Sequence, residues 1–432
     1  MQVAVENGQG LERRMTVGLE ADQVDAEVEK RLREFARSAR VPGFRPGKVP
    51  LKVLRQRYAG QMRQEVFSEL VRTSFSEAVA EEELQPVGVP QIEPDIDVSA
   101  RYYAYTARFE VLPRFELGPL DGKTLKRPVA EVTDADLEAM LVRLREQQRT
   151  WSVVERPARM GDRLRISYTG ILDGEPLEGS SEEDTELELG LGDMIPGFEE
   201  CLVGVQAGDE RQLDLTFPDQ YPNADLQGKP VVFTVRVGEV AEPVLPELDA
   251  DFARSLGVAD GDPDGFRLEL RRDMARKLKE LIRDRLKEQV MDLLMEVNRI
   301  DLPDALVLEE IRALKERVFR NLGGGSRLEL PDDLFRDRAR RRVALGLIIG
   351  EIVKTKGIEV DPKRVREAVE DLASTYEEPQ QAIDYFYADQ ERLAPVESLT
   401  LENQVVDWVL DQVTVEDEPT TFEALSTPAA IE

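Results

Sequence analysis

Two stretches in the middle of the chain carry its most specific pattern: "GDRLRISYTGILDG" at residues 161–174 and "GLGDMIPGFEECLVGVQAGDERQLDLTFP" at residues 190–218. Glycine and proline are frequent here, and apolar and polar residues alternate in short runs at 163–170, 210–217 and 231–237. Alternation with a period of two is typical of strands that bury one face, while glycine and proline mark turns. The pattern predicts a compact, mostly β domain over residues 151–243.

The segment before this domain mixes helical and strand patterns. Residues 22–40 are predicted to form a helix, because acidic residues come early and basic residues late, the order that the helix dipole favours. From Pro50, apolar residues recur every three to five positions to about residue 83, which predicts a long helix. Residues 14–20 and 101–113 alternate like strands. Residues 1–112 are therefore predicted to form an α+β domain.

The remaining segments have helical patterns. A helix at 131–150, capped at Thr133 or Asp134, lies in a connector over 113–150 that we associate with the C-terminal domain. Residues 244–432 predict an extended all-α domain with a mobile tail from about residue 416. Its predicted helices span 262–297, 304–321, 331–356, 362–375 and 397–413. The predicted fold class is therefore multidomain α+β.

Composition excludes several kinds of chemistry. The 432 residues include no histidine and one cysteine, Cys201, which excludes a Ser-His-Asp or Cys-His nucleophile, a histidine metal site and an internal disulfide. No metal or cofactor is expected. The N-terminus lacks the apolar core of a signal peptide and no run is long enough to span a membrane. We therefore expect a cytoplasmic protein without a membrane partner.

A stiff, basic loop joins the two helices of the N-terminal segment: "VPGFRPGKVP" at residues 41–50. From Lys30 to Arg72 there are twelve Lys or Arg and three Glu, a local charge of +9 in a chain of net charge −30. Two interpretations stay open, a solvated helix face or a patch directed at phosphates. Phe44 at the tip is either an apolar anchor for a partner or a staple between the two helices.

The middle domain resembles the FKBP-type peptidyl-prolyl isomerases. The shared features are a strand ending Tyr-Thr-Gly at 168–170, an Ile-x-Gly-aromatic turn at 195–198 that opens a short helix, and a Gly-Asp turn at 208–209. The resemblance implies an apolar pocket for an X-Pro segment. Its residues would be Phe198 as the floor, Ile195 as a backbone N–H donor to the substrate carbonyl, Met194 beside it, Tyr168 and Phe233 as walls, and Tyr221 at the rim.

Three positions depart from that family. Leu177 and Thr185 stand where phenylalanines are usual, and Glu178 where an aspartate is common. A wall that lacks two rings is shallower, which implies a lower catalytic rate. For each pocket residue, plain packing in the domain core is the alternative interpretation.

The chemistry of such a pocket suits a chain without histidine. Rotation about an X-Pro bond faces a barrier of about 18–20 kcal/mol because amide conjugation is lost at its top. The twisted amide is less dipolar than the planar one, so an apolar pocket that excludes water favours it without any proton transfer. Aromatic and aliphatic walls are then sufficient to catalyse the rotation.

The chain as a whole resembles the trigger factor family of bacterial ribosome-associated chaperones. The loop fits the Gly-Phe-Arg-x-Gly-x-x-Pro signature of that family, and the length and domain order agree with it. The resemblance implies docking on an exit-tunnel protein and adjacent ribosomal RNA, with nascent or unfolded polypeptides as further partners and no DNA. It leaves a homodimer of the free form open. The docking residues would be Gly43, Phe44, Arg45, Pro46, Gly47 and Lys48.

Within that loop, Phe44 would be the apolar anchor and Arg45 the charged contact, while Pro46 replaces a lysine of many relatives. The long C-terminal helices would hold unfolded segments. Candidate contacts lie on one helical stripe, which is equally typical of a buried core: Met274, Leu278, Ile282 and Met291.

Three functions follow as alternatives. The first is a cytoplasmic, partly ribosome-bound chaperone that binds nascent polypeptides at the exit tunnel, prevents premature misfolding and catalyses cis/trans isomerisation of X-Pro bonds. The second is a free-standing prolyl isomerase. The third is a chaperone whose FKBP-like domain is a weakly active substrate-docking module.

Overall fold

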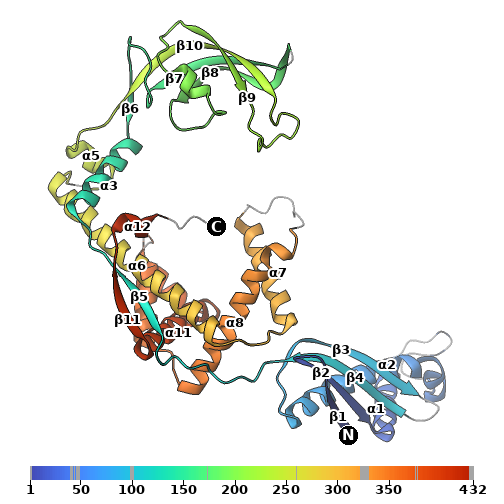
Figure 1. Ribbon diagram of the computed structural model, residues 1–432. Coiled ribbons are helices and arrows are strands. Elements are labelled where there is room, and N and C mark those ends of the chain that lie inside the picture. Colours follow the sequence, from blue (N-terminus) through green and yellow to red (C-terminus); the bar gives the residue numbers. More distant parts are fainter. Residues whose placement is uncertain are drawn as a thin grey trace. The chain divides into compact units, whose positions relative to one another are not determined.

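The structure is a computed structural model and describes residues 2–38, 42, 44, 49–97, 102–172, 174–258, 260–321, 330–374, 376 and 378–427. These residues form an α+β part, a β-rich part and a helical part, which confirms the predicted fold class (Figure 1). The chain divides into two compact units, Met1–Arg127 with Asp284–Glu418 and Pro128–Arg283 with Pro419–Glu432. Of the described helices, none combines the length and apolarity that a membrane crossing requires.

The N-terminal part is a four-stranded antiparallel sheet with two helices packed on it. The sheet order is β1 (Gln2–Asn7), β2 (Glu12–Leu19), β4 (Tyr102–Val111) and β3 (Pro86–Asp97). The helices are α1 (Ala21–Ala36) and α2 (Leu51–Glu81). The predicted strands at 14–20 and 101–113 match β2 and β4. The edge strands β1 and β3 were not predicted, and β3 carries three prolines, which a sheet tolerates mainly at its edge.

The β-rich part is a five-stranded antiparallel sheet with a short helix, α4 (Phe198–Leu202). Its strands are β6 (Thr150–Val153), β7 (Arg163–Leu172), β8 (Glu175–Glu188), β9 (Glu210–Thr216) and β10 (Pro230–Val244). The long strand β10 pairs with β7 along its length, with β9 at its start and with β6 at its end. The three alternating runs of the sequence are therefore β7, β9 and β10, as the pattern predicts.

The same unit contains a small helical cluster. It is formed by α3 (Asp134–Gln147), α5 (Ala250–Ser255), α12 (Phe422–Ser426) and the first half of α6 (Pro263–Val297). The side chain of Thr133 accepts the backbone N–H of Asp136, and the Asp136 carboxylate accepts the N–H of Thr133. This reciprocal capping box fixes the start of α3 at one of the two predicted caps.

The remaining helices belong to the first unit. They are α7 (Asp304–Asn321), α8 (Asp333–Lys356), α9 (Pro362–Ala373), α10 (Pro379–Tyr387) and α11 (Gln390–Gln412). Helix α11 begins earlier than the predicted residue 397, because Asp389 accepts the N–H of Glu391 at 2.9 Å and Pro395 is accommodated inside the helix. Helix α10 was not predicted. A two-stranded sheet joins β5 (Thr124–Val129) to β11 (Thr414–Pro419).

The C-terminal segment differs from the prediction of a mobile tail from about residue 416. Strand β11 pairs with β5, and Lys126 and Arg127 form ion pairs with Glu418 and Asp417. Helix α12 follows and buries Phe422 against Phe266 and other residues of the helical cluster. The three charged residues Glu416, Asp417 and Glu418 suggested solvation, but they lie on a paired strand. Residues 428–432 lie outside the described residues.

The candidate cradle residues lie in cores. Met274 and Leu278 are buried in the helical cluster with Ile282 packed beside them, and Met291 is buried among α6, α8 and α11. The sequence left open whether these residues contact clients or form a core, and in the structure they pack in cores. Large apolar side chains that are exposed on or between the described helices from α6 to α11 are Leu268, Leu308, Leu334, Leu372, Tyr376, Tyr385, Tyr387 and Leu399.

Replacing Phe422 tests the packing of the C-terminal segment. We expect Phe422→Ala to lower the free energy of unfolding of the helical cluster by about 3 kcal/mol, the usual cost of truncating a buried phenylalanine. Hydrogen exchange of residues 414–427 measures this as lost protection. Glu423→Ala, at the exposed neighbouring position, is the control. Rapid exchange of this segment in the unmodified protein would contradict the packed arrangement.

Candidate functional site

A cavity of about 450 Å³ opens on the β-rich part. Strands β7, β8 and β10 supply its inner wall, and the two loops around Ile195 and Tyr221 supply its rim. Six of the seven predicted pocket residues line it: Tyr168, Leu177, Met194, Ile195, Tyr221 and Phe233. Residues that are distant in sequence are thus brought together as the resemblance implied.

Phe198 lies differently from the prediction that it forms the pocket floor. Its side chain is fully buried, with 0% exposed, and does not line the cavity. Its ring instead packs edge-on against two lining rings, with centroids 5.8 Å from Tyr168 and 5.3 Å from Phe233. Such edge-to-face pairs are favourable beyond the area they bury. Phe198 therefore supports the aromatic walls from behind.

The loop before α4 is held by a buried carboxylate. Glu199 is 5% exposed, and it accepts the backbone N–H groups of Gly190 at 2.7 Å, Gly192 at 3.1 Å and Met194 at 3.3 Å. Burial opposes ionisation of this group, but the backbone donors outweigh burial and hold the pKa of the Glu199 carboxyl below its ordinary value. The carboxylate thereby fixes the main chain that presents Met194 and Ile195 to the cavity.

Gly197 completes this turn. Its φ of +90° lies in the left-handed region, which residues with a side chain rarely adopt, and it directly precedes the first residue of α4. The backbone N–H of Phe198 then donates to the Ile195 carbonyl at 3.1 Å. The turn directs Phe198 into the core while Ile195 stays at the cavity.

The wall opposite this turn contains Tyr168. Burial raises the pKa of its hydroxyl, and the facing carboxylate of Glu182, which accepts a hydrogen bond from it, adds to the rise. Glu182 is the register partner of Tyr168 across β7 and β8, at a point where the pairing is irregular. The Tyr168 hydroxyl is therefore neutral at ordinary pH, and its side chain forms part of the cavity wall.

The two positions that lack phenylalanine differ in their placement. Leu177 lines the cavity, and its carbonyl accepts the Ser180 hydroxyl at 2.8 Å. Thr185 lies opposite Ile166 in the sheet and is not among the lining residues. The side chain of Glu178 lies outside the described residues. Of the two substitutions, Leu177 is the one that changes the wall.

Several lining residues were missed by the sequence analysis: Ser180, Asp193, Pro196, Phe217, Pro218, Asn223 and Leu226. Phe217 is the largest of them, and its ring lies 4.7 Å from that of Tyr221. The sequence did carry a signal for Phe217, because Leu213 and Phe217 share one face of an alternating run and both are buried. Ser180 lies on β8, and the others lie in turns or loops, where periodicity carries no information.

Close approach of the backbone also shapes the wall. A Cβ added to Gly170 would lie 2.9 Å from the ring of Phe233 and 2.5 Å from the Ser180 hydroxyl. Real side-chain atoms essentially never come so close. Glycine at 170 therefore permits Phe233 to lie against β7.

The predicted docking loop is only partly described. Phe44 is 40% exposed, so it is not enclosed between the two helices as a staple would be. Gly43, Arg45, Pro46, Gly47 and Lys48 lie outside the described residues. The helices on either side are joined by ion pairs between Arg31 and Glu69 and between Arg55 and Glu29.

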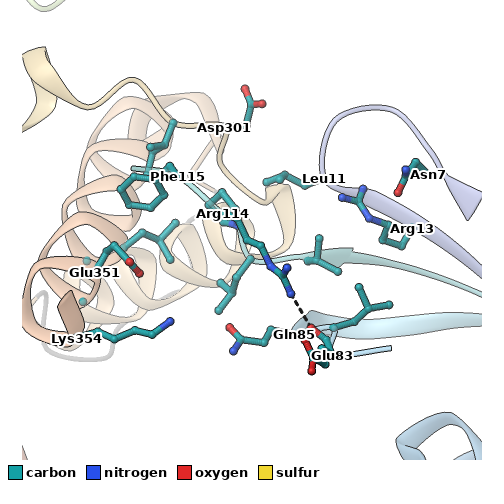
Figure 2. Close-up of a pocket in the computed structure, with 18 of the residues that line it drawn as sticks. Asn7, Leu11, Arg13, Glu83, Gln85, Arg114, Phe115, Asp301, Glu351 and Lys354 are labelled. Atoms are coloured by element: carbon teal, nitrogen blue, oxygen red, sulfur yellow. Dashed lines mark hydrogen bonds between the residues drawn. The ribbon is translucent and has the colours of Figure 1, made fainter. Parts of the chain in front are cut away.

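A larger cavity, of about 1230 Å³, lies in the first unit. Figure 2 shows charged side chains of both signs around it, with the Arg114 guanidinium donating to the Glu83 carbonyl at 3.0 Å. No group of three or more Cys, Asp or Glu with metal-binding geometry occurs among the described residues, here or elsewhere. None of the residues that the FKBP-type resemblance names lines this cavity, whereas six of them line the smaller one, which is therefore the better candidate site.

The fold and the cavity together define a chain in which a β-rich domain with an apolar cavity is inserted between an α+β part and a helical part. A family model described as FKBP-type peptidyl-prolyl cis-trans isomerase matches residues 154–238. Models for the bacterial trigger factor protein and for its C-terminus match residues 1–144 and 264–411. The chain belongs to the trigger factor family.

Individual relatives agree over the full length. The chain is 46% identical over 430 residues to the trigger factor of Pseudomonas paraeruginosa and 45% identical over 430 residues to that of Stutzerimonas stutzeri, with 99% of both chains covered each time. A solved structure of a trigger factor chaperone has a TM-score of 0.51 at 20% identity, and covers 95% of this chain and 99% of that one. At that identity the last comparison shows the fold alone.

Removing the charge of Glu199 tests its role in the loop. We expect Glu199→Gln to lower the free energy of unfolding of this domain by about 2 kcal/mol at pH 7. Because the folded pKa is lowered, the difference from the unmodified protein persists down to about 4.5, the ordinary value, and shrinks as the pH falls through the folded pKa.

Urea unfolding followed by the fluorescence of Trp151 measures this effect, with Trp408→Phe in every protein so that the signal reports the β-rich part. Glu200→Gln is the matched control, since it makes the same change at the exposed neighbour. Equal destabilisation by the two substitutions, or a difference that grows as the pH falls below 4.5, would contradict this role of Glu199.

Proposed function

We propose that this chain is a cytoplasmic chaperone that docks on translating ribosomes, binds nascent and unfolded polypeptides, prevents premature misfolding and catalyses cis/trans isomerisation of X-Pro bonds. Membership of the trigger factor family supports the chaperone part. The observation that carries the catalytic part is the apolar cavity lined by Tyr168, Phe217, Tyr221 and Phe233 in a domain of the FKBP type.

The cavity favours isomerisation by its surroundings. A proline ring that enters it leaves water and contacts the rings of Tyr168, Phe217 and Phe233, while the chain around it lies at the open rim. The twisted amide is less dipolar than the planar one, so the free energy of activation falls when water is excluded. The Ile195 backbone N–H is the donor that we assign to the substrate carbonyl, because its loop is fixed by Glu199.

The docking step rests on the loop at 41–50. We assign Phe44 as the apolar anchor, and its exposure supports this assignment. Arg45 and Lys48 supply positive charge toward an exit-tunnel protein and ribosomal RNA, Gly43 and Gly47 permit the turn, and Pro46 stiffens it. The local charge of +9 on an otherwise acidic chain favours approach through this end.

A second candidate function, a weakly active substrate-docking domain, is favoured by one observation. Leu177 lines the cavity where the family usually has a phenylalanine, so one wall offers less area to a proline ring. The two candidates differ in turnover on a short peptide. Both candidate functions predict that the peptide binds in the same cavity.

Replacing a rim residue tests catalysis. We expect Tyr221→Ala to lower kcat/KM on a short Xaa-Pro peptide about three- to tenfold, the effect of losing one aromatic contact. Met160→Ala, at an exposed position of the same domain outside the cavity, is the control and should match the unmodified protein. Tight peptide binding without measurable turnover would support the docking-domain alternative, and unchanged kcat/KM in Tyr221→Ala would contradict this site.

Replacing the loop tip tests docking. We expect the double variant Phe44→Ala, Arg45→Ala to lose co-sedimentation with ribosomes at least tenfold, because it removes the anchor and a phosphate-directed charge. Arg33→Ala, an exposed cation at the end of α1, is the matched control. Undiminished pelleting of the double variant would refute the docking assignment, and no pelleting of the unmodified protein would favour a free-standing isomerase.

A further inference from the structure

A second apolar cavity lies in the N-terminal part, between helix α2 and strand β3, and has a volume of about 790 Å³. We call it the α2–β3 groove. From α2 it is lined by Gly60, Arg63, Gln64, Phe67, Ser68, Val71, Arg72 and Phe75, and from β3 by Val89, Pro90, Ile92, Pro94 and Ile96. It shares no lining residue with the loop at 41–50 or with the cavity of the FKBP-type domain.

The strand side of the groove is open to solvent. Strand β3 is the last strand of its sheet, and its pairing with β4 is interrupted between Val87 and Gln91. Val89 in this interruption is 91% exposed, and Ile96 is 40% exposed. Apolar side chains that line a concave surface and remain exposed are typical of a binding site for an apolar partner.

The charges of the groove are both positive. Of the described residues that line it, the charged ones are Arg63 and Arg72, and none is a carboxylate. Neither arginine has an ion-pair partner among the residues that the structure describes, and the buried Nε of Arg63 has no hydrogen-bond partner there either. A buried donor without a partner is unfavourable, and an incoming acceptor that bonds to it removes this penalty.

The two arginines flank the apolar floor. They are nine positions apart on α2, about two and a half turns, so they lie on opposite edges of the helix face that carries Phe67 and Val71. Arg63 is partly buried and Arg72 is exposed. A carboxylate beside the apolar floor therefore meets a cation that has no ion pair to break first.

We propose that the α2–β3 groove binds extended polypeptide segments in which apolar side chains flank an aspartate or glutamate, with Arg63 as the carboxylate contact. This deepens the proposed chaperone function, on which it rests, by naming a class of client segment. The argument is charge complementarity: an apolar floor selects apolar side chains, and an unpaired guanidinium selects a carboxylate over an amide or a cation.

The dimensions and chemistry of the groove limit how such a segment binds. Its α2 wall runs from Gly60 to Phe75, about 23 Å of helix, which matches about seven residues of extended chain. Pro90 and Pro94 have no backbone N–H, so β3 does not offer a continuous ladder for an added strand. Side-chain contacts, and not main-chain pairing, therefore carry the affinity.

The test uses the full chain and two fluorescein-labelled heptapeptides, in which leucine and valine flank a central glutamate or a central glutamine. Fluorescence anisotropy measures both dissociation constants. We expect the glutamate peptide to bind about tenfold more tightly, as a charge-assisted hydrogen bond implies. Arg63→Met, which keeps the aliphatic part of the side chain, should abolish that preference, and Arg63→Lys should restore part of it.

Two further variants separate the groove from general effects. Arg33→Met removes an exposed cation of α1 outside the groove and should leave the preference unchanged. Val89→Ser lies at a fully open position, where loss of folding is not expected, and should weaken both peptides by a similar factor. Equal binding of the two peptides by the unmodified protein, or equal effects of Arg33→Met and Arg63→Met, would overturn the proposal.

Two more measurements distinguish other outcomes. If sedimentation shows that Arg63→Met changes the oligomeric state while peptide binding is unaffected, the groove is an interface between copies of the chain and the proposal fails. Suppression of aggregation of a heat-unfolded client by the unmodified protein tests the chaperone function itself. If the protein suppresses aggregation but shows no preference for the glutamate peptide, the groove assignment is wrong and the chaperone function stands.

Discussion

The Glu199 carboxylate accepts three backbone N–H groups from the loop that precedes it, and the candidate site is arranged around this interaction. A carboxylate is rarely buried unless its oxygens are saturated by donors, and here the donors come from the main chain. The loop is thereby fixed at one end, and the left-handed Gly197 turns the chain sharply at the other. Between them, Met194 and Ile195 face the cavity while Phe198 is directed into the core. An apolar pocket thus depends on a buried charge that does not line it.

Much of the fold could be predicted from the sequence, because the alternating runs that became β7, β9 and β10 and the long periodic runs that became α2 and α6 are strong local signals. The cavity could be predicted only through resemblance, and the residues Tyr168, Ile195 and Phe233 that it named line one cavity. Phe198 was placed in the pocket because sequence does not distinguish a ring that lines a cavity from one that supports the lining ring. Glu199 was missed because an acidic residue in the first turn of a helix usually interacts with the helix dipole at the surface. Strand β11 was missed because its partner lies far away in sequence and its charges resembled a solvated tail.

The charges of the chain are organised separately from its candidate catalysis. Isomerisation needs shape and low polarity, so the absence of histidine excludes nothing that this pocket requires. The ion pairs instead hold elements together, as Lys126 and Arg127 do with β11. Beside the apolar floor of the α2–β3 groove, Arg63 and Arg72 have no ion-pair partner among the described residues. In a molecule of net charge −30, such unpaired cations are the places where an acidic partner meets the least repulsion.

The pairing of β11 with β5 also sets the order in which this chain folds during its own synthesis. The backbone N–H of Thr414 donates to the Lys123 carbonyl, so strand β5 has no partner until about 290 more residues have been added. At 5–20 residues per second this takes roughly 15 to 60 seconds. The N-terminal sheet and the FKBP-type sheet close within their own segments and need no such wait. The helical core around β5 is therefore completed last, after the elements that we assign to docking and isomerisation are already formed.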